Sequence, residues 1–210
     1  LDSALHYYRK AMSISDTVDR SGSVDHLNNI ATIFISMGEF REAENALNSA
    51  IRLSREISDS LALGSTLQFS SFLYSRTAEF AKGLANNDSA IAIFKKSGHR
   101  IRLAGTYASR ATIYSSMGEN KKSIQANLYA DSLYQEEIQA EQRGILNNNI
   151  GIVYISQGDY PTALKYLQKS LAVLPKGVIS ESYLLTQGNL AECYVGLKKY
   201  KEARSLLHEC

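Results

Sequence analysis

The sequence repeats with a period of forty residues, and this period restricts the possible folds more than any other feature. The phrase LNNIATIFISMGEF at 27–40 returns as LNNNIGIVYISQGDY at 146–160. Steps of forty reach only aromatic residues in one series, which is Phe34, Tyr74, Tyr114, Tyr154 and Tyr194. They reach only small residues in a second series, which is Ala31, Ser71, Ala111, Gly151 and Ala191. A fixed period of this length predicts an array of similar structural units.

Each unit is predicted to be a hairpin of two helices. Apolar residues recur at helical spacing within it, as at Ile150 and Tyr154. A short break follows, in which Gly158 would end the first helix and Asp159 would begin the second. Pro161 then falls in the first helical turn, where its missing N–H costs nothing. Neither helix can bury its apolar face alone, so the hairpins are expected to stack.

The predicted fold is therefore all-α, a single solenoid of stacked antiparallel helix hairpins with no linker and no second domain. A leading helix is expected at 2–15. The repeats are expected at about 24–57, 64–97, 104–138, 144–175 and 181–210.

The two ends of the sequence fall within the repeat pattern. The first residue is Leu1, and Cys210 lies inside an amphipathic pattern, so we expect the chain to be a fragment of a longer protein. Apolar residues at the ends of the solenoid would favour end-to-end contacts or a homo-oligomer. These residues are Leu5, Tyr8, Leu206 and Leu207.

The repeated positions resemble those of the tetratricopeptide repeat family. Its pattern is met by Gly151, Tyr154, Gly158, Tyr160, Ala163, Ser170 and Pro175, and the resemblance covers essentially the whole chain. The usual unit of the family has 34 residues. A unit of forty resembles the variants in kinesin light chains, in spindle-orientation adaptors and in bacterial signalling proteins. The phrases LDSALHYYRKAMSI and DSAIAIF look most like the bacterial group. The resemblance implies a right-handed superhelix.

The resemblance also implies a binding groove. In this family the first helix of each hairpin lines a concave surface, which includes the positions three and two residues before the small residue. The candidate groove residues are Asn28, Asn29, Gln68, Ser109, Asn148, Asn149 and Asn189. A side-chain amide offers both a donor and an acceptor, as an extended peptide backbone requires. The alternative is that these amides cross-link neighbouring first helices or face water.

One class of ligand is disfavoured by the same comparison. Family members that bind chaperone tails hold a terminal carboxylate with Lys three places before the small residue and Asn one place after it. The first place holds Asn28, Gln68, Ala108, Asn148 and Gly188, and the second holds Thr32, Phe72, Thr112, Ile152 and Glu192. This clamp is absent from the sequence, so a chaperone-tail adaptor is not expected.

The second and third repeats break the apolar pattern. Polar residues stand where other repeats have apolar ones, namely Ser70, Asn87, Arg110, Asn127 and Asp131. A buried charge is costly unless it is paired, so we predict that Arg110 and Asp131 lie close together. Two interpretations of this polar middle are open. It is either local drift, with Arg110 extending to the surface, or a flexible joint or polar pocket.

Several classes of function are not expected from the composition. The net charge is +2, and no apolar stretch approaches the roughly 20 residues that cross a bilayer. The histidines lack metal-ligand spacing, and the sequence has no phosphate-binding glycine loop or catalytic constellation. We therefore predict no enzyme activity, catalytic residue, metal, cofactor, nucleic acid or membrane for this segment. The compartment stays open, cytoplasmic or, after export, periplasmic.

The sequence thus favours a non-catalytic domain that binds a protein or peptide. Its concave groove would bind an extended or helical segment, as the sensory or scaffolding part of a bacterial regulator, a setting that only the resemblance implies. Two alternatives remain. One is a structural array that oligomerises, and the other is a regulatory domain attached to a kinase or DNA-binding module outside this chain.

Overall fold

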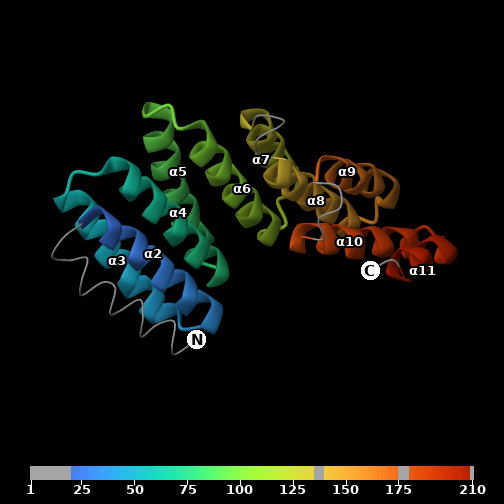
Figure 1. The fold of residues 1–210 in the computed structure, drawn as a ribbon, viewed down its shortest axis with the longest axis horizontal. Helices are drawn as coiled ribbons and strands as arrows, with labels where there is room; N and C mark the ends of the chain where they lie inside the picture. The colour runs from blue at the N-terminus through green and yellow to red at the C-terminus, as the bar shows by residue number, and fades with distance from the viewer. Residues whose placement is uncertain (1–19, 135–139, 175–179, 209–210) are drawn as a thin grey trace. The chain divides into compact units, whose positions relative to one another are not determined.

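The fold consists of helical hairpins, as the sequence predicts. The computed structural model describes residues 20–134, 140–174 and 180–208, and their regular structure is entirely helical (Figure 1). The first helices of the hairpins are α2 (Arg20–Met37), α4 (Ser60–Arg76), α6 (Arg100–Ser116), α8 (Ala140–Ser156) and α10 (Glu181–Gly196). The second helices are α3 (Phe40–Glu56), α5 (Phe80–Lys96), α7 (Asn120–Leu133), α9 (Tyr160–Val173) and α11 (Tyr200–His208). The all-α solenoid is thereby confirmed. The second helix of each hairpin begins forty residues after the second helix of the hairpin before it.

Some predictions fall on residues that the structure does not describe. The leading helix at 2–15, with Leu5 and Tyr8, lies outside the described residues. The same holds for the side chain of Leu207 and for the predicted repeat ends at 138, 175 and 210.

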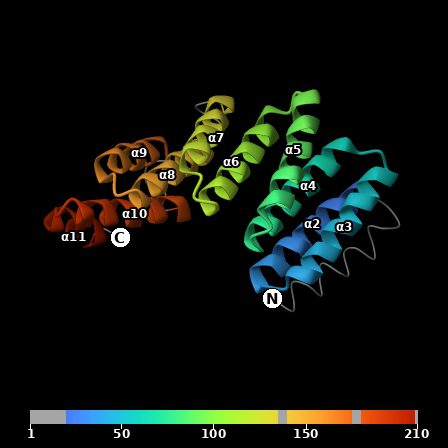
Figure 2. The same cartoon turned by 180° about the vertical axis from the view of Figure 1, so that it is seen from behind.

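The chain forms two compact units, residues 1–117 and 118–210. The boundary falls between α6 and α7, inside the third repeat. In unit 1, α2 contacts α4 and α4 contacts α6, while α3 packs on α2 and α5 on α4. In unit 2, α8 contacts α10 in the same way. Figure 2 lets the reader follow the helices of each unit from behind. A single continuous domain stays a prediction.

Most first helices end in the same hydrogen-bonded turn. Its positive-φ position holds Gly38, where φ is 79°, and Glu39 N–H donates to the carbonyl of Phe34 at 2.9 Å. Gly118 and Gly158 share this positive φ, as the sequence predicts, and so does Gly98 at the end of α5. Three side chains without this freedom adopt the same conformation, namely Ser58, Ala78 and Lys198. Only glycine adopts it without steric cost, so these three turns are strained.

The acids that begin the second helices differ in what they do. Asp159 Oδ1 accepts a hydrogen bond from Thr162 N–H at 3.2 Å, which caps α9 as predicted. Glu39 and Glu119 occupy the same N-terminal cap position of α3 and α7, but their side chains make no capping hydrogen bond. Glu119 instead pairs with Lys122 one turn later, at 3.3 Å. The extra methylene of Glu carries its carboxylate past the free N–H groups that Asp can reach.

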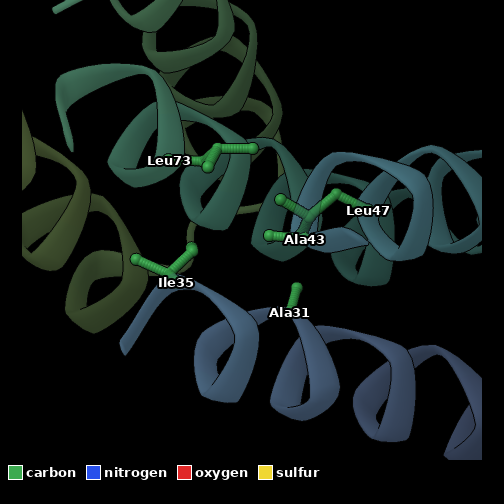
Figure 3. Packing of buried hydrophobic residues seen from close by; sticks show 5 residues of the cluster. All are labelled: Ala31, Ile35, Ala43, Leu47 and Leu73. Carbon is green, nitrogen blue, oxygen red and sulfur yellow. The ribbon is translucent and has the colours of Figure 1, made fainter. Parts of the chain in front are cut away.

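The core of the first hairpin shows how small residues admit close packing. Ala31 on α2 and Ala43 on α3 are fully buried where the two helices meet. Ile35, Leu47 and Leu73 complete the cluster, and Figure 3 shows their side chains meeting between α2, α3 and α4. Each such burial of a large aliphatic side chain stabilises the fold by about 1.5–3 kcal/mol.

Glycines provide still closer contacts between the first and second helices of a hairpin. A Cβ on Gly151 would lie 2.8 Å from the Leu167 side chain, and one on Gly64 would lie 2.9 Å from the ring of Phe94. Both large side chains are fully buried, so neither can move aside.

Arg110 and Asp131 each have partners within their own unit, and their predicted approach to one another, from unit 1 to unit 2, stays a prediction. Arg110 Nε donates to Asn87 Oδ1 at 2.8 Å, and its guanidinium also pairs with Asp88. Asp131 accepts from Arg143 Nε at 2.8 Å, inside unit 2. Each charged side chain binds a helix of an adjacent hairpin in its own unit, α5 for Arg110 and α8 for Asp131, and is thereby paired.

The other polar residues of the middle repeats are also buried. Ser70 donates to the carbonyl of Thr66 at 3.0 Å, and Asn87 Nδ2 donates to that of Thr106 at 3.0 Å. Asn127 is 1% exposed, and its Oδ1 has no hydrogen-bond partner. Asn87 is therefore integrated into a network, whereas the corresponding Asn127 is not.

Candidate functional site

The predicted groove residues differ in how far they reach solvent. All lie on first helices, and we call the surface made by α2, α4 and α6 in unit 1, and by α8 and α10 in unit 2, the first-helix face. Asn28 and Asn148 are buried, whereas Asn29 is exposed. The half-buried members are Gln68, Ser109, Asn149 and Asn189.

Two of these residues pair across adjacent first helices in each unit. Asn189 Nδ2 donates to Asn148 Oδ1 at 2.8 Å, between α10 and α8. Gln68 Nε2 approaches Ser109 Oγ at 3.4 Å, between α4 and α6. Both pairs are 41 residues apart, which joins the position three before the small residue to the position two before it in the next repeat. These contacts are the cross-links that the sequence left open as an alternative.

This 41-residue spacing between partners also explains why the side-chain amide of Asn28, in the first repeat, is unpaired. Asn28 is 1% exposed, and neither Oδ1 nor Nδ2 has a hydrogen-bond partner. The residue 41 places later is Phe69, which packs on the apolar cluster of α2 and α3. An aromatic ring cannot replace the missing polar partner, so Asn28 stays unsatisfied.

Unit 1 also contains a pocket on its first-helix face. The pocket has a volume of about 320 Å³, at the lower end of the range for ligand sites. Its lining comes from α2, α4 and α6, and consists of Thr32, Ser65, Gln68, Phe69, Phe72, Arg102 and Ser109. Two of the predicted groove residues, Gln68 and Ser109, are among them. We call it the Phe72 pocket.

The lining combines an apolar wall with polar groups. Phe72 is 41% exposed, which is unusual for a phenyl side chain. Gln68 Oε1 accepts from Thr106 Oγ1 at 3.5 Å, the outer limit of a hydrogen bond. Both polar contacts of the Gln68 amide are therefore long and weak, and a ligand could replace them. This composition suits an extended chain with one apolar side chain.

Sequence reasoning missed Ser65 and Arg102 as members of this site. Arg102 N–H donates to Ser65 Oγ, which links α6 to α4. The residues forty places from Arg102 are Ala62 and Gln142, so no repeated property marked the position. The period finds residues that recur, whereas Arg102 is specific to one repeat.

Two observations on the described residues concern metal binding and thiol chemistry. Among them, no three His, Cys, Asp or Glu side chains gather where they could hold a metal ion. Burial raises the pKa of the Cys193 thiol to about 11, and the nearby Glu192 adds to the shift. This thiol therefore stays protonated and is a poor nucleophile at neutral pH. None of the described helices has the length and apolar character needed to span a bilayer.

The hairpin stack and its first-helix face define the chain as a helical-repeat protein. Residues 142–210 match the sequence family described as tetratricopeptide repeat, and residues 5–77 match the family described as anaphase-promoting complex subunit 5. A search of curated protein sequences found no significant match. The predicted resemblance to tetratricopeptide repeats is thus confirmed, by sequence for residues 142–210 and by fold for the other described hairpins.

Solved structures with this fold come from several kinds of protein. BtubC (BKLC) from P. vanneervenii aligns with a TM-score of 0.78 and 19% identity over 99% of this chain and 85% of that one. A signal transduction ATPase with a tetratricopeptide repeat sensor, PH0952 from Pyrococcus horikoshii, aligns at 0.80 and 18% identity over 97% of this chain and 30% of that one. The quorum sensor NprR from B. thuringiensis aligns at 0.76 and 14% identity over 99% of this chain and 59% of that one. At these identities the likeness concerns the fold alone.

Proposed function

We propose that the chain is a non-catalytic repeat domain that binds a protein partner, and that its first-helix face binds an extended peptide segment of that partner. The Phe72 pocket carries this proposal, because it opens on the predicted face and is lined by the predicted Gln68 and Ser109. The weakly held amide of Gln68 can hydrogen-bond to the backbone of an extended peptide, and the exposed ring of Phe72 can contact one of its side chains.

The setting that fits best is the sensory or scaffolding part of a regulator, bacterial as the repeat phrases imply. The similar structures include a tetratricopeptide repeat sensor and a quorum sensor, which supports this setting. An attached catalytic or DNA-binding module would lie outside this chain.

The proposal is tested with peptides selected by display against the purified chain. Affinities are then measured by calorimetry for the wild type and for Gln68→Ala. Loss of one ligand hydrogen bond would weaken binding by about 0.5–1.5 kcal/mol, or roughly 2–10-fold. The melting temperature should stay unchanged, because both Gln68 contacts are long.

Asn48→Ala is the matched control. Asn48 is an exposed amide on α3, which is a second helix, so its loss should leave affinity unchanged. Equal affinities for the wild type, Gln68→Ala and Asn48→Ala would refute peptide binding at this face. The array would then act through its other surfaces, as a scaffold.

A further inference from the structure

The Phe72 pocket contains one formal charge, and it is positive. Arg102 provides it, and no acidic residue is in the lining. None of the described ion pairs includes Arg102, whose contact is the hydroxyl of Ser65. A guanidinium has five N–H donors in a planar fork, so most of them are available to a ligand.

A second observation concerns what surrounds this cation. The hydroxyls of Ser65 and Ser109 line the pocket on α4 and α6, and the Gln68 amide is part of the same lining. Each hydroxyl donates its one hydrogen to a backbone carbonyl of its own helix, Ser65 to Leu61 and Ser109 to Gly105. The Gln68 amide, whose contacts are long, is therefore the group that can donate a hydrogen bond to an anion that Arg102 binds. The rings of Phe69 and Phe72 form the apolar part of the lining.

From this arrangement we propose that the Phe72 pocket recognises an acidic peptide segment. A side-chain carboxylate of the segment pairs with Arg102, and an apolar side chain two residues away packs on Phe72. Side chains at i and i+2 of an extended chain point to the same side, so one segment can supply both. This inference rests on the proposed function and adds the chemical class of the ligand.

The charge of the ligand follows from the charge of the pocket. One Arg balances one carboxylate, whereas a phosphorylated side chain carries about −1.5 to −2 and would leave charge unbalanced. The preference is also local to unit 1. The position forty residues after Arg102 is Gln142, which is exposed and uncharged, so it offers a carboxylate no ion pair.

The experiment uses two pools of capped octapeptides that differ at one position. One pool has fixed Leu-x-Glu and the other has fixed Leu-x-Gln, so that Glu supplies the fixed carboxylate and both termini are neutral. Binding to the full chain is measured by fluorescence anisotropy. The Glu pool should bind about 10-fold more tightly than the Gln pool, which corresponds to about 1.4 kcal/mol. This difference should shrink as salt is added.

Arg102→Gln should remove the difference by weakening the Glu pool alone. Arg100→Gln is the matched control, because Arg100 is an exposed arginine of the same helix outside the pocket. It should leave both pools unchanged. A third pool with Leu-x-Gln and a free carboxyl terminus should bind no better than the capped Gln pool. Tighter binding of that pool through Arg102 would overturn the assignment to a side-chain carboxylate.

The failures of the two proposals are distinguishable. Equal binding of the Glu and Gln pools, or a loss of both pools in Arg102→Gln, overturns the acidic preference while leaving peptide binding intact. Absence of binding by every pool overturns both proposals. If both pools bind and Gln68→Ala leaves their affinities unchanged, the proposal that the first-helix face binds the peptide is refuted.

Discussion

Replacing asparagine with leucine should change the free energy of unfolding in opposite directions at two equivalent positions, Asn87 and Asn127. Asn87 and Asn127 occupy the place that Leu47 and Leu167 hold in other repeats, and all four side chains are buried. The residue 23 places later in the sequence determines the surroundings of each amide. For Asn87 this residue is Arg110, which bonds to it, whereas for Asn127 it is the buried Ile150.

Asn87→Leu should destabilise unit 1 by about 1 kcal/mol. The change removes a hydrogen bond to a charged donor, worth about 1.5–3 kcal/mol, and one to the Thr106 carbonyl, worth about 1 kcal/mol. Burial of the leucine returns about 1.5–3 kcal/mol. Arg110 is left with exposed Asp88, and such surface pairs contribute about 0–1 kcal/mol.

Asn127→Leu should stabilise unit 2 by about 1–3 kcal/mol. The change removes an unsatisfied buried acceptor that costs about 1–3 kcal/mol and adds a buried leucine. Fitting the larger side chain opposes part of this gain, with a cost of about 1–3 kcal/mol. Leu167 shows that the position accepts leucine in the next repeat, where it packs beside Leu190.

A double variant completes the test. Asn87→Leu with Arg110→Leu recreates the Leu167 and Leu190 pair, so it should recover the loss and reach or exceed wild-type stability. Urea unfolding followed by circular dichroism gives each free energy. Equal destabilisation by Asn87→Leu and Asn127→Leu, or additive effects of Asn87→Leu and Arg110→Leu within about 0.5 kcal/mol, would refute the reasoning.

Three further predictions concern glycines, a turn and a tyrosine. Gly64→Ala should lower the free energy of unfolding in urea by about 1–3 kcal/mol, because the new Cβ would meet the buried ring of Phe94. Gly188→Ala has open space around it and should raise that free energy by about 0.5–1 kcal/mol. An increase in both variants would contradict the packing. Ala78→Gly should raise the melting temperature through about 1 kcal/mol of relieved strain, since φ at Ala78 is 59°, and a lower melting temperature would contradict this. Burial and the hydrogen bond to Glu44 raise the pKa of Tyr74 to about 12. The folded state thus holds this proton more tightly, so stability falls between pH 10 and 12. Tyr74→Phe should lose one phenolate transition near pH 12 at 295 nm and flatten that fall, and an unchanged titration would exclude Tyr74 as its source.

The helical hairpins could be predicted from sequence because their cause is local. Apolar spacing, Gly118 and Gly158 in the turns, and small residues at the crossings each act within one hairpin or between neighbours. A forty-residue period repeats these local causes and makes them visible. The same signal located Gln68 and Ser109 on the face where the pocket lies.

The partners of the polar residues depended on tertiary structure. Arg110 bonds to Asn87, and Asn148 pairs with Asn189, because the offset between adjacent helices decides which side chains meet. That offset comes from packing between hairpins, and no single hairpin contains it. Arg102 lines the pocket for the same reason, since the pocket forms only when α6 packs against α4.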